Sequence, residues 1–495
     1  MSNKNILYEL GEYPPRYGPE WGSGGIFGLK YYRGILYYTL AFEAESHFIG
    51  RERHRIYRFE LVGSQPVSGG DTYNAVDTVD EKIYFGGWVH APAIYKGRSS
   101  KGLATISFRN KYSHVHEYDV ENDDIKLLWK ESIHDEDKWT GEVSDIIYDP
   151  YGDRLLLARG DGHVNLGIYS LDRRNGRISM ISNKPVLRGS LYLDHACFGV
   201  HVFPTGTYGI ECVDLIEKGI KTRMFNQEDK KAIDRGKVLY PLMGDAISAY
   251  GRFFLFVRGG VYVGNPIDEL IEPLKFIRLM DFGINAYGPL RTVAKPLGGG
   301  ILIAYNTYTN SVFYHDNPNI VRSINTIVGP SVLLYITPPT VRIIGAYGAR
   351  ITGIERVGSK LVLATNTMAN LAQYDVSPFD TGYRGFVVES ISELLSRSPP
   401  ITYIVPNYLV GNNAFGGIPL SGYRYPRLII NASMDNELVI YSYNLSLPLS
   451  SVDADRFSIR RGINIIELDK YRGLIVSFKY REFDRKLLTK IILEN

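Results

Sequence analysis

The chain is organised around a recurring unit: a short turn, a strand of four to six apolar residues, a polar turn, and a second strand ending in an aromatic residue and an acid or amide. The clearest copies are "GDRLLLARGDGHVNLGIYSLD" from Gly152, "GSKLVLATNTMANLAQYDVS" from Gly358 and "YPRLIINASMDNELVIYSYN" from Tyr425. Each copy has the length and turn chemistry of a β-hairpin. Because an isolated hairpin is only marginally stable in water, these hairpins must stack on one another.

Further strand-like segments precede several copies. Three or four short strands therefore recur about every 45 to 70 residues, without a long helical pattern between them. This spacing is typical of the four-stranded blade of a β-propeller, and the apolar runs indicate that both faces of each blade are covered. The sequence predicts an all-β chain that forms a single β-propeller of about eight four-stranded blades, with seven or nine as alternatives.

The ends of the chain and two helical segments complete the predicted architecture. Both "NILYEL" from Asn5 and the C-terminal "LLTKIILEN" have strand-like patterns, and we expect them to pair and close the ring. Short helices are expected near 226–236 and 386–398, the second ending before two prolines. Both helices fall in connections between strands, so residues 1–495 are expected to form one domain.

The composition supports strands and tight turns, with 37 tyrosines, 21 phenylalanines and 50 glycines. The net charge of +3 is spread without long blocks of one sign, which excludes a broad nucleic-acid footprint. No apolar run is long enough to span a bilayer, and we expect a cytoplasmic protein. Only three glutamines occur beside many ionic side chains, a composition typical of thermophiles.

The two cysteines, Cys197 and Cys212, have two interpretations. They form one disulfide if their strands pair, which a thermophile cytosol tolerates. Otherwise they are two buried thiols.

Familiar catalytic signatures are missing from the sequence. It contains no GxxxxGK[ST], HExxH, CxxC or GxSxG motif, and "WGSGGIFG" from Trp21 has phenylalanine where a dinucleotide-binding fingerprint needs its third glycine. Most common enzyme classes therefore lack support, and no cofactor is predicted.

The segment "YFGGWVHAPAIY" from Tyr84 places two large rings in a strand. Because side chains alternate along a strand, Trp88 and His90 share a face and could project together toward a ligand. Gly86 and Gly87 permit a bulge or the close approach of another backbone. The alternative is that Trp88 fills a gap between blades and His90 bonds to a carbonyl.

The innermost strands of the predicted blades carry a second set of candidate ligand-binding residues. Alignment of the blades brings five charged side chains near the channel mouth: Asp77, Asp145, Asp245, Arg291 and Arg350. Such a ring could hold a polar or anionic ligand, with arginines donating to carboxylate or phosphate. The same residues could instead pair with one another across the channel.

Candidate metal ligands lie around "LYLDHACFGVH" from Leu191. Asp194, His195 and His201, together with Glu211, are residue types that bind zinc, iron or manganese, so a divalent metal is an alternative cofactor. Their spacing matches no closed metal motif, and a surface or turn cluster is the competing interpretation.

Two histidines lie two residues apart in "YSHVHEYD" from Tyr112. His114 and His116 share a strand face and could chelate a metal, although two ligands alone bind weakly. We expect a solvated outer strand here.

The blade repeats and the phrase "YFGGWVHAPA" resemble an uncharacterised archaeal protein family that is carried as a domain of unknown function. The resemblance covers most of the chain. It implies a β-propeller and a thermophilic archaeal origin, and it transfers no catalytic residue.

The leading functional hypothesis is a non-enzymatic scaffold or ligand-binding module that contacts a protein partner or a small polar ligand through the channel mouth. The first alternative is a metal-dependent hydrolase, lactonase or lyase, because such a site assembles from different blades without a local motif. The second is carbohydrate binding through exposed tyrosine and tryptophan rings.

Overall fold

The computed structural model describes most of the chain, and nearly all of its regular structure is β-strand. The described residues are 4–13, 25–41, 43–59, 70–89, 93–94, 105–106, 112–133, 135, 137–202, 206–225, 232–234, 237–239, 242–283, 287–307, 328–366 and 384–495. Within these ranges, no helix has the length and apolar character needed to cross a membrane.

Among the described residues, seven antiparallel sheets of three or more strands follow one another along residues 26–390, and we number them in chain order. The first contains β1 (Ile26–Tyr32), β2 (Ile35–Leu40), β3 (Glu45–Ile49) and β4 (His54–Arg58). The second contains β5 (Gly70–Asp71), β6 (Val76–Val79), β7 (Lys82–Val89), β10 (Tyr112–Asp119) and β11 (Asp124–Glu131). The third contains β12 (Glu142–Asp149), β13 (Arg154–Asp161), β14 (Gly167–Asp172) and β15 (Ile178–Ser182).

Of the remaining sheets of this series, the fourth, fifth and sixth contain four strands each and the seventh contains three. The fourth contains β16 (Val186–Tyr192), β17 (His195–Val202), β18 (Gly206–Asp214) and β19 (Ile220–Met224). The fifth contains β22 (Met243–Ala249), β23 (Arg252–Val257), β24 (Gly260–Gly264) and β25 (Lys275–Arg278). The sixth contains β26 (Lys295–Leu297), β27 (Gly300–Tyr305), β28 (Ser331–Thr337) and β29 (Thr340–Tyr347), and the seventh β30 (Arg350–Val357), β31 (Lys360–Asn366) and β32 (Arg384–Ser390).

Most of these sheets are simple meanders, in which strands adjacent in sequence pair with one another. Central strands such as β2 and β23 carry long buried apolar runs, because neighbouring sheets cover both of their faces. Four-stranded meanders packed face to face are the blades of β-propellers. The predicted all-β class built from such sheets is confirmed.

Each sheet of the series shares a hydrophobic core with the next. Six clusters of buried side chains join the first sheet to the second, the second to the third, and so on to the seventh. A further cluster joins the seventh sheet back to the first, where Val362 and Ala364 pack with Leu29 and Leu36. At the same junction, Thr352 Oγ1 donates a hydrogen bond of 2.6 Å to the Ile26 carbonyl.

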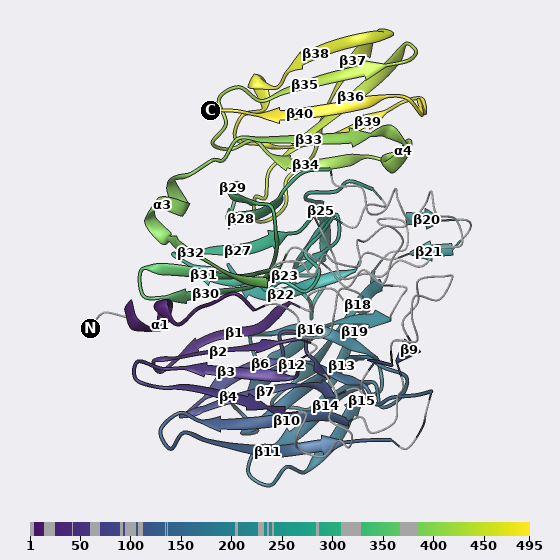
Figure 1. Cartoon of the computed structure of the whole chain (residues 1–495). Helices are drawn as coiled ribbons and strands as arrows, with labels where there is room; N and C mark the ends of the chain where they lie inside the picture. Colours follow the sequence, from purple (N-terminus) through teal and green to yellow (C-terminus); the bar gives the residue numbers. More distant parts are fainter. Residues whose placement is uncertain are drawn as a thin grey trace.

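The last two sheets are built differently. Their strands are β33 (Ile401–Pro406), β34 (Phe415–Pro419), β35 (Arg427–Ala432), β36 (Asn436–Tyr443), β37 (Asp453–Ile459), β38 (Gly462–Glu467), β39 (Ile475–Tyr480) and β40 (Leu488–Leu493). One sheet has the order β33-β40-β35-β38 and the other β34-β39-β36-β37, so the chain crosses repeatedly between them. Figure 1 shows both at one end of the molecule, and they share a core with the fifth and sixth sheets.

The predicted pairing of the two chain ends is wrong. The C-terminal strand β40 pairs with β33 and β35, which lie in the same part of the chain. The N-terminal segment forms a helix, α1 (Lys4–Tyr8), instead of a strand. Ile6 of this helix is buried in the cluster between the seventh and first sheets, so the segment contributes by packing rather than by sheet pairing.

The expected helices are shorter or fall outside the described residues. Helix α3 (Ile391–Ser396) covers only part of the predicted range 386–398, because the β-branched residues before it pair with β31 in strand β32. Residues 226–231 and 235–236 of the other predicted helix lie outside the described residues, and Ala232–Asp234 between them is strand β20, which pairs with β21 (Lys237–Leu239).

Four short elements complete the description. They are helix α4 (Asn407–Val410), the 3-10 helix η3 (Asp469–Tyr471), and strands β8 (Ala93–Ile94) and β9 (Thr105–Ile106), which pair with each other.

Two further side-chain pairs are resolved by the fold. Cys197 and Cys212 lie directly opposite each other on β17 and β18 and form a disulfide, so the thiol interpretation is wrong. The expectation that His114 and His116 lie on a solvated strand is also wrong. Their strand β10 is covered by the first sheet, and both imidazoles pack among aromatic rings such as Phe59.

Candidate functional site

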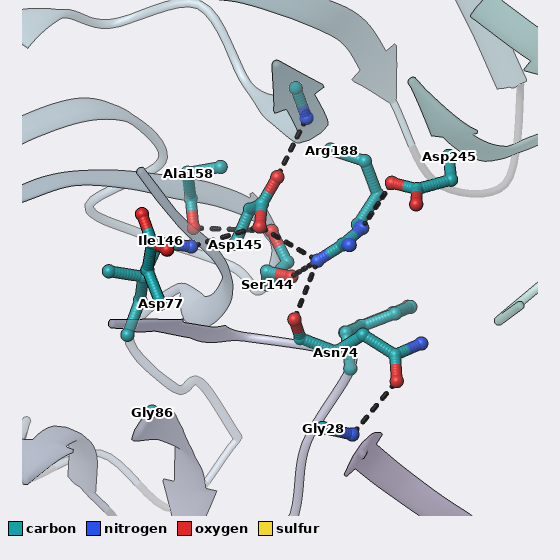
Figure 2. Close-up of polar contacts among 12 residues, drawn as sticks. Gly28, Asn74, Asp77, Gly86, Ser144, Asp145, Ile146, Ala158, Arg188 and Asp245 are labelled. Atoms are coloured by element: carbon teal, nitrogen blue, oxygen red, sulfur yellow. Dashed lines mark hydrogen bonds and ion pairs between the residues drawn. The ribbon is translucent and has the colours of Figure 1, made fainter. Parts of the chain in front are cut away.

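Arg188 of the fourth sheet lies at the meeting point of several sheets (Figure 2). Its Nε donates to Asp245 Oδ1 at 3.0 Å, and its Nη1 donates to Asp145 Oδ1 at 2.8 Å. The same Nη1 is within hydrogen-bond distance of the carbonyl oxygens of Asn74, at 2.9 Å, and Ser144, at 3.1 Å. One buried guanidinium therefore connects the second, third and fifth sheets to the fourth.

Local irregularities of the inner strands orient the side chains of Asp145, Asp245 and Arg188. The β12–β13 ladder shifts register between Val143 and Asp145, and the β22–β23 ladder shifts between Met243 and Asp245. The β16–β17 ladder has a similar shift beside Arg188. Because a β-bulge redirects the side chains next to it, the shifts turn both acids and the arginine toward one another.

The other carboxylate oxygens join neighbouring sheets through backbone N–H groups. Asp145 Oδ2 accepts from Gly189 N at 2.7 Å, and Asp245 Oδ2 accepts from Ala294 N at 2.7 Å. Asp77, the third predicted acid, accepts from Tyr148 N at 2.7 Å. Each of these acids therefore joins its own sheet to the next sheet along the chain.

The charges of this cluster are unequal, with two carboxylates facing one guanidinium. Burial raises the pKa of Asp145 to about 7, Arg188 opposes that shift, and Asp245 adds to it. Burial alone would lower the pKa of Arg188, but the two acids reverse the effect and raise it. The guanidinium therefore stays charged and the cluster favours the retention of one proton by its acids.

The two predicted arginines pack against aromatic rings. The Arg291 guanidinium lies over the ring of Tyr73, 4.3 Å from its centroid, and Arg291 has a left-handed backbone with φ of 54°. Arg350 is fully buried and donates from Nε to Asn366 Oδ1 at 2.8 Å. Both also lie within 6 Å of the Phe27 ring centroid, so they share an aromatic contact.

Trp88 packs between sheets. Its ring stacks on Trp139 with a centroid distance of 4.2 Å, and both rings are buried. A side chain at Gly86 would meet Val143 of the third sheet at 2.9 Å, which explains the glycine by close approach. His90 lies outside the described residues, and a ligand role for Trp88 and His90 stays a prediction.

Two of the predicted metal ligands, Asp194 and His195, contact each other, and the other two have separate partners. His195 Nδ1 lies 2.6 Å from Asp194 Oδ1, His201 Nδ1 lies 3.0 Å from Thr207 Oγ1, and Glu211 pairs with Lys184 Nζ at 2.9 Å. Burial lowers the pKa of His201 to about 4. In the part of the chain that the structure describes, no three His, Cys, Asp or Glu side chains are grouped to hold a metal ion.

A groove of about 670 Å³ lies between the fifth sheet and the C-terminal sheet β34-β39-β36-β37. One wall is the segment of β25 that includes Lys275 and Arg278, and the other includes Tyr441, Tyr443 and Ser477. Tyr441 and Ser477 are partners across β36 and β39, on the face directed away from the buried side chains of that sheet. The groove is therefore formed where two sheets distant in sequence meet.

Hydrogen bonds hold the two walls of the groove together. Tyr443 donates from its hydroxyl to the Arg278 carbonyl at 2.9 Å and lies 2.7 Å from Ser477 Oγ. Burial raises the pKa of Tyr443 to about 12, so this hydroxyl stays protonated. Main-chain bonds between Asp281 and Gly416 continue the contact beyond the groove.

The charge of the groove is positive. Its lining includes Lys275 and Arg278 and contains no aspartate or glutamate. Burial lowers the pKa of Arg278, and Asp281, outside the lining, pairs with its guanidinium. Lys275 forms no ion pair with any residue that the structure describes. An anion in this groove would therefore have Lys275 available as a cation, with no acid in the walls.

Sequence reasoning identified two members of the central cluster and none of the groove. Arg188 stands in "PVLRGSLY", an inner strand that lacks the hairpin pattern, and only its alignment with Asp145 and Asp245 could have revealed it. The groove residues are far apart in the chain, and no local signal joins Lys275 to Tyr441.

Comparisons with known proteins add a family and several remote structural matches. A family model described as "Uncharacterized protein conserved in archaea (DUF2139)" matches residues 36–374. No curated protein matches the chain. The propeller domain of the Trilobed protease from Pyrococcus furiosus matches with 13% identity and a TM-score of 0.38, covering 74% of this chain and 93% of that one.

Two further solved structures are similar at the same level. Hydrazine synthase from Kuenenia stuttgartiensis matches with 10% identity and a TM-score of 0.41, covering 75% of this chain and 96% of that one. The aldose sugar dehydrogenase from Streptomyces coelicolor in its PQQ-bound form matches with 11% identity and a TM-score of 0.33, covering 77% and 98%.

Proposed function

The chain belongs to the archaeal family DUF2139, and we propose that it is a non-enzymatic binding protein that holds a small organic anion in the groove between its fifth sheet and its C-terminal sheets. The observation that carries this proposal is the position of Lys275, which forms no ion pair with a described residue, in a groove whose lining contains no acidic residue. The volume of about 670 Å³ is within the range of small-molecule sites.

The ligand should combine an anionic group with an apolar or aromatic body. Lys275 supplies donors for a carboxylate or phosphate, and Arg278, which pairs with Asp281, lies in the same lining. Tyr441, Leu449 and Val452 supply apolar surface in the same groove. A flat ring can pack on a tyrosine while its charged group reaches β25.

For the architecture, we propose seven blades rather than eight, with the two C-terminal sheets as a separate β-sandwich attached to the fifth and sixth blades. The cyclic order of shared cores supports this number, because the seventh sheet packs on the first. The crossing strand order of the last two sheets supports their separate status. In this arrangement the Arg188 cluster fills the centre of the ring, which directs ligand binding elsewhere.

Isothermal titration calorimetry with three probes tests the proposed binding site. Phenyl phosphate carries both features of the ligand, whereas phenol and inorganic phosphate carry one each. We expect phenyl phosphate to bind most tightly. Substitution of Lys275→Gln should weaken it about tenfold, equivalent to about 1.4 kcal/mol. Lys479→Gln is the matched control, because Lys479 is an exposed cation on the neighbouring strand β39 and does not line the groove.

Three outcomes would contradict the proposal. Phenyl phosphate could fail to bind, Lys275→Gln could behave like Lys479→Gln, or a neutral sugar could bind with an affinity that neither substitution changes. The last result would favour the carbohydrate alternative. Tyr441→Ala adds a test of the apolar wall, since it should weaken phenyl phosphate and leave inorganic phosphate unchanged.

A further inference from the structure

Strand β38 (Gly462–Glu467) is the open edge of the C-terminal sheet β33-β40-β35-β38. It pairs only with β35 in the described structure, and Figure 1 shows it at the outer end of the molecule. An edge strand presents unpaired backbone groups that are a template for another strand.

The register identifies which backbone groups face outward. Leu468 N donates to Pro426 O at 2.9 Å, so even-numbered residues of this ladder point their N–H and C=O groups toward β35. The odd residues Ile463, Ile465 and Glu467 therefore point theirs toward the open edge. Within the described residues, these outward groups take part in no other hydrogen bond.

The side chains of the same odd residues form an exposed strip on one face of the sheet. Ile463 is 75% exposed and Ile465 is 62% exposed, and Glu467 follows on the same face. Exposed edge strands usually carry charges that prevent pairing, as Lys221 and Arg223 do on β19. Strand β38 has two adjacent exposed isoleucines and a charge only at its end.

The charges at the two ends of this strip are complementary. Arg461 precedes the strand, Glu467 ends it, and both side chains are exposed. Neither forms an ion pair within the part of the chain that the structure describes. An antiparallel copy of the same strand would bring opposite charges together at both ends.

We infer that β38 pairs antiparallel with β38 of a second copy of this chain, about a two-fold axis at Asn464. In this register Ile463 is opposite Ile465 of the partner subunit, and Arg461 is opposite Glu467 of the partner subunit. Each Ile463–Ile465 pair exchanges both of its backbone hydrogen bonds. The result is one continuous sheet through two subunits, with a central isoleucine cluster between two ion pairs.

The register is specific. Only odd-numbered residues direct their backbone groups outward. Any other two-fold pairing must therefore shift the partner strand by two residues relative to this one. Centring the axis on Ile465 would place Ile463 opposite Glu467 of the partner subunit and would lose both ion pairs. Asn464 supports the strand start by accepting from Arg460 N and donating to the Arg460 carbonyl, which fixes Arg461 beside the strip. The contact is isologous, as in most homodimers.

Sedimentation equilibrium of the full chain and its variants tests this inference. The wild type should have twice the 55.9 kDa mass of one chain. Ile465→Lys should give a monomer, because an edge lysine opposes pairing. Met180→Lys is the matched control, since Met180 is an exposed apolar residue of another outer strand, β15, and its substitution should leave the dimer intact.

Charge exchange tests the register. Glu467→Arg and Arg461→Glu should each raise the dimer dissociation constant about tenfold, because like charges then lie opposite each other, and the double exchange should restore it. A monomeric wild type at high micromolar concentration would overturn the inference. A dimer unaffected by Ile465→Lys and by both single exchanges would also overturn it. None of these results depends on the groove and its ligand.

Discussion

Arg188 Nη1 lies 2.8 Å from Asp145 Oδ1, and both side chains are buried where the third and fourth sheets meet. Asp245 accepts from the same guanidinium. A charge placed there is stabilised only while its partner is present, since breaking a buried pair leaves an uncompensated charge. The cluster therefore contributes to the integrity of the ring.

Arg188→Met should lower the free energy of unfolding by about 3–5 kcal/mol, because it leaves the buried acids Asp145 and Asp245 without their cation. Equilibrium denaturation measures the change. Arg174→Met is the control, since Arg174 is exposed and pairs with Asp153 at the surface, where such pairs contribute at most about 1 kcal/mol. Equal effects of the two substitutions would contradict a structural role for Arg188.

Glu43→Gln should destabilise the junction of the seventh and first sheets. Arg384 Nη1 lies 2.7 Å from Glu43 Oε2, with both side chains almost fully buried, so removal of the negative charge should cost about 3 kcal/mol. Denaturation of Glu437→Gln provides the comparison. Glu437 pairs with the exposed Arg456, and its loss should cost less than about 1 kcal/mol. A Glu43→Gln protein as stable as Glu437→Gln would be the contrary result.

The repeat predicted the hairpin from Gly152 correctly, because a hairpin depends on a turn and strand patterns close together in sequence, whereas the second strand of the copy from Gly358 lies outside the described residues. "GDRLLLARGDGHVNLGIYSLD" from Gly152 indeed supplies β13 and β14, which pair with each other. "YPRLIINASMDNELVIYSYN" from Tyr425 has the same pattern, yet its strands β35 and β36 belong to different sheets. Strand β35 pairs with the distant β38 and β40, and no local pattern encodes that choice.

The same distinction separates the predicted from the missed site residues. Asp145 and Asp245 were found because they occupy equivalent places in recurring inner strands. Their partner Arg188 and the groove residues Lys275 and Tyr441 depend on which sheets come together, a property of tertiary packing. The sequence also did not decide whether Cys197 and Cys212 form a disulfide, because the bond requires them to be opposite each other in one ladder.

Reduction of the Cys197–Cys212 disulfide should destabilise the fourth sheet. The bond closes a loop with a sequence separation of 15, for which the loss of chain entropy in the unfolded state corresponds to about 3 kcal/mol. Denaturation with and without dithiothreitol measures the difference. The Cys197→Ala/Cys212→Ala variant should match the reduced protein and should not respond to reductant. Two reactive thiols in the unreduced, denatured wild type would contradict the bond.

Acid should destabilise the protein through His114 and His116. Their Nδ1 atoms lie 3.0 Å apart in an aromatic environment, and neither Nε2 has a hydrogen-bond partner within the described structure. Burial lowers the pKa of His116 to about 3 and that of His114 well below its ordinary value, with His116 adding to the shift at His114. Both histidines are therefore neutral in the folded protein at pH values where the unfolded chain binds protons.

The sign of the effect follows from proton binding. Between the unfolded pKa of about 6.5 and the lower folded values, the unfolded chain holds more protons, so stability falls as the pH falls. Each histidine contributes a slope of up to about 1.4 kcal/mol per pH unit. Asp145 has the opposite effect, because its raised pKa makes the folded state hold the extra proton.

The difference between wild type and a His114→Gln/His116→Gln variant isolates the histidine contribution from that of Asp145. Denaturation of both proteins at several pH values between about 4 and 8 should give a variant that is less stable at neutral pH and has a smaller loss toward acid. The exposed His163 provides the control, because His163→Gln should keep the wild-type slope. Parallel curves for the wild type and the double variant would show that the buried pair does not govern acid sensitivity.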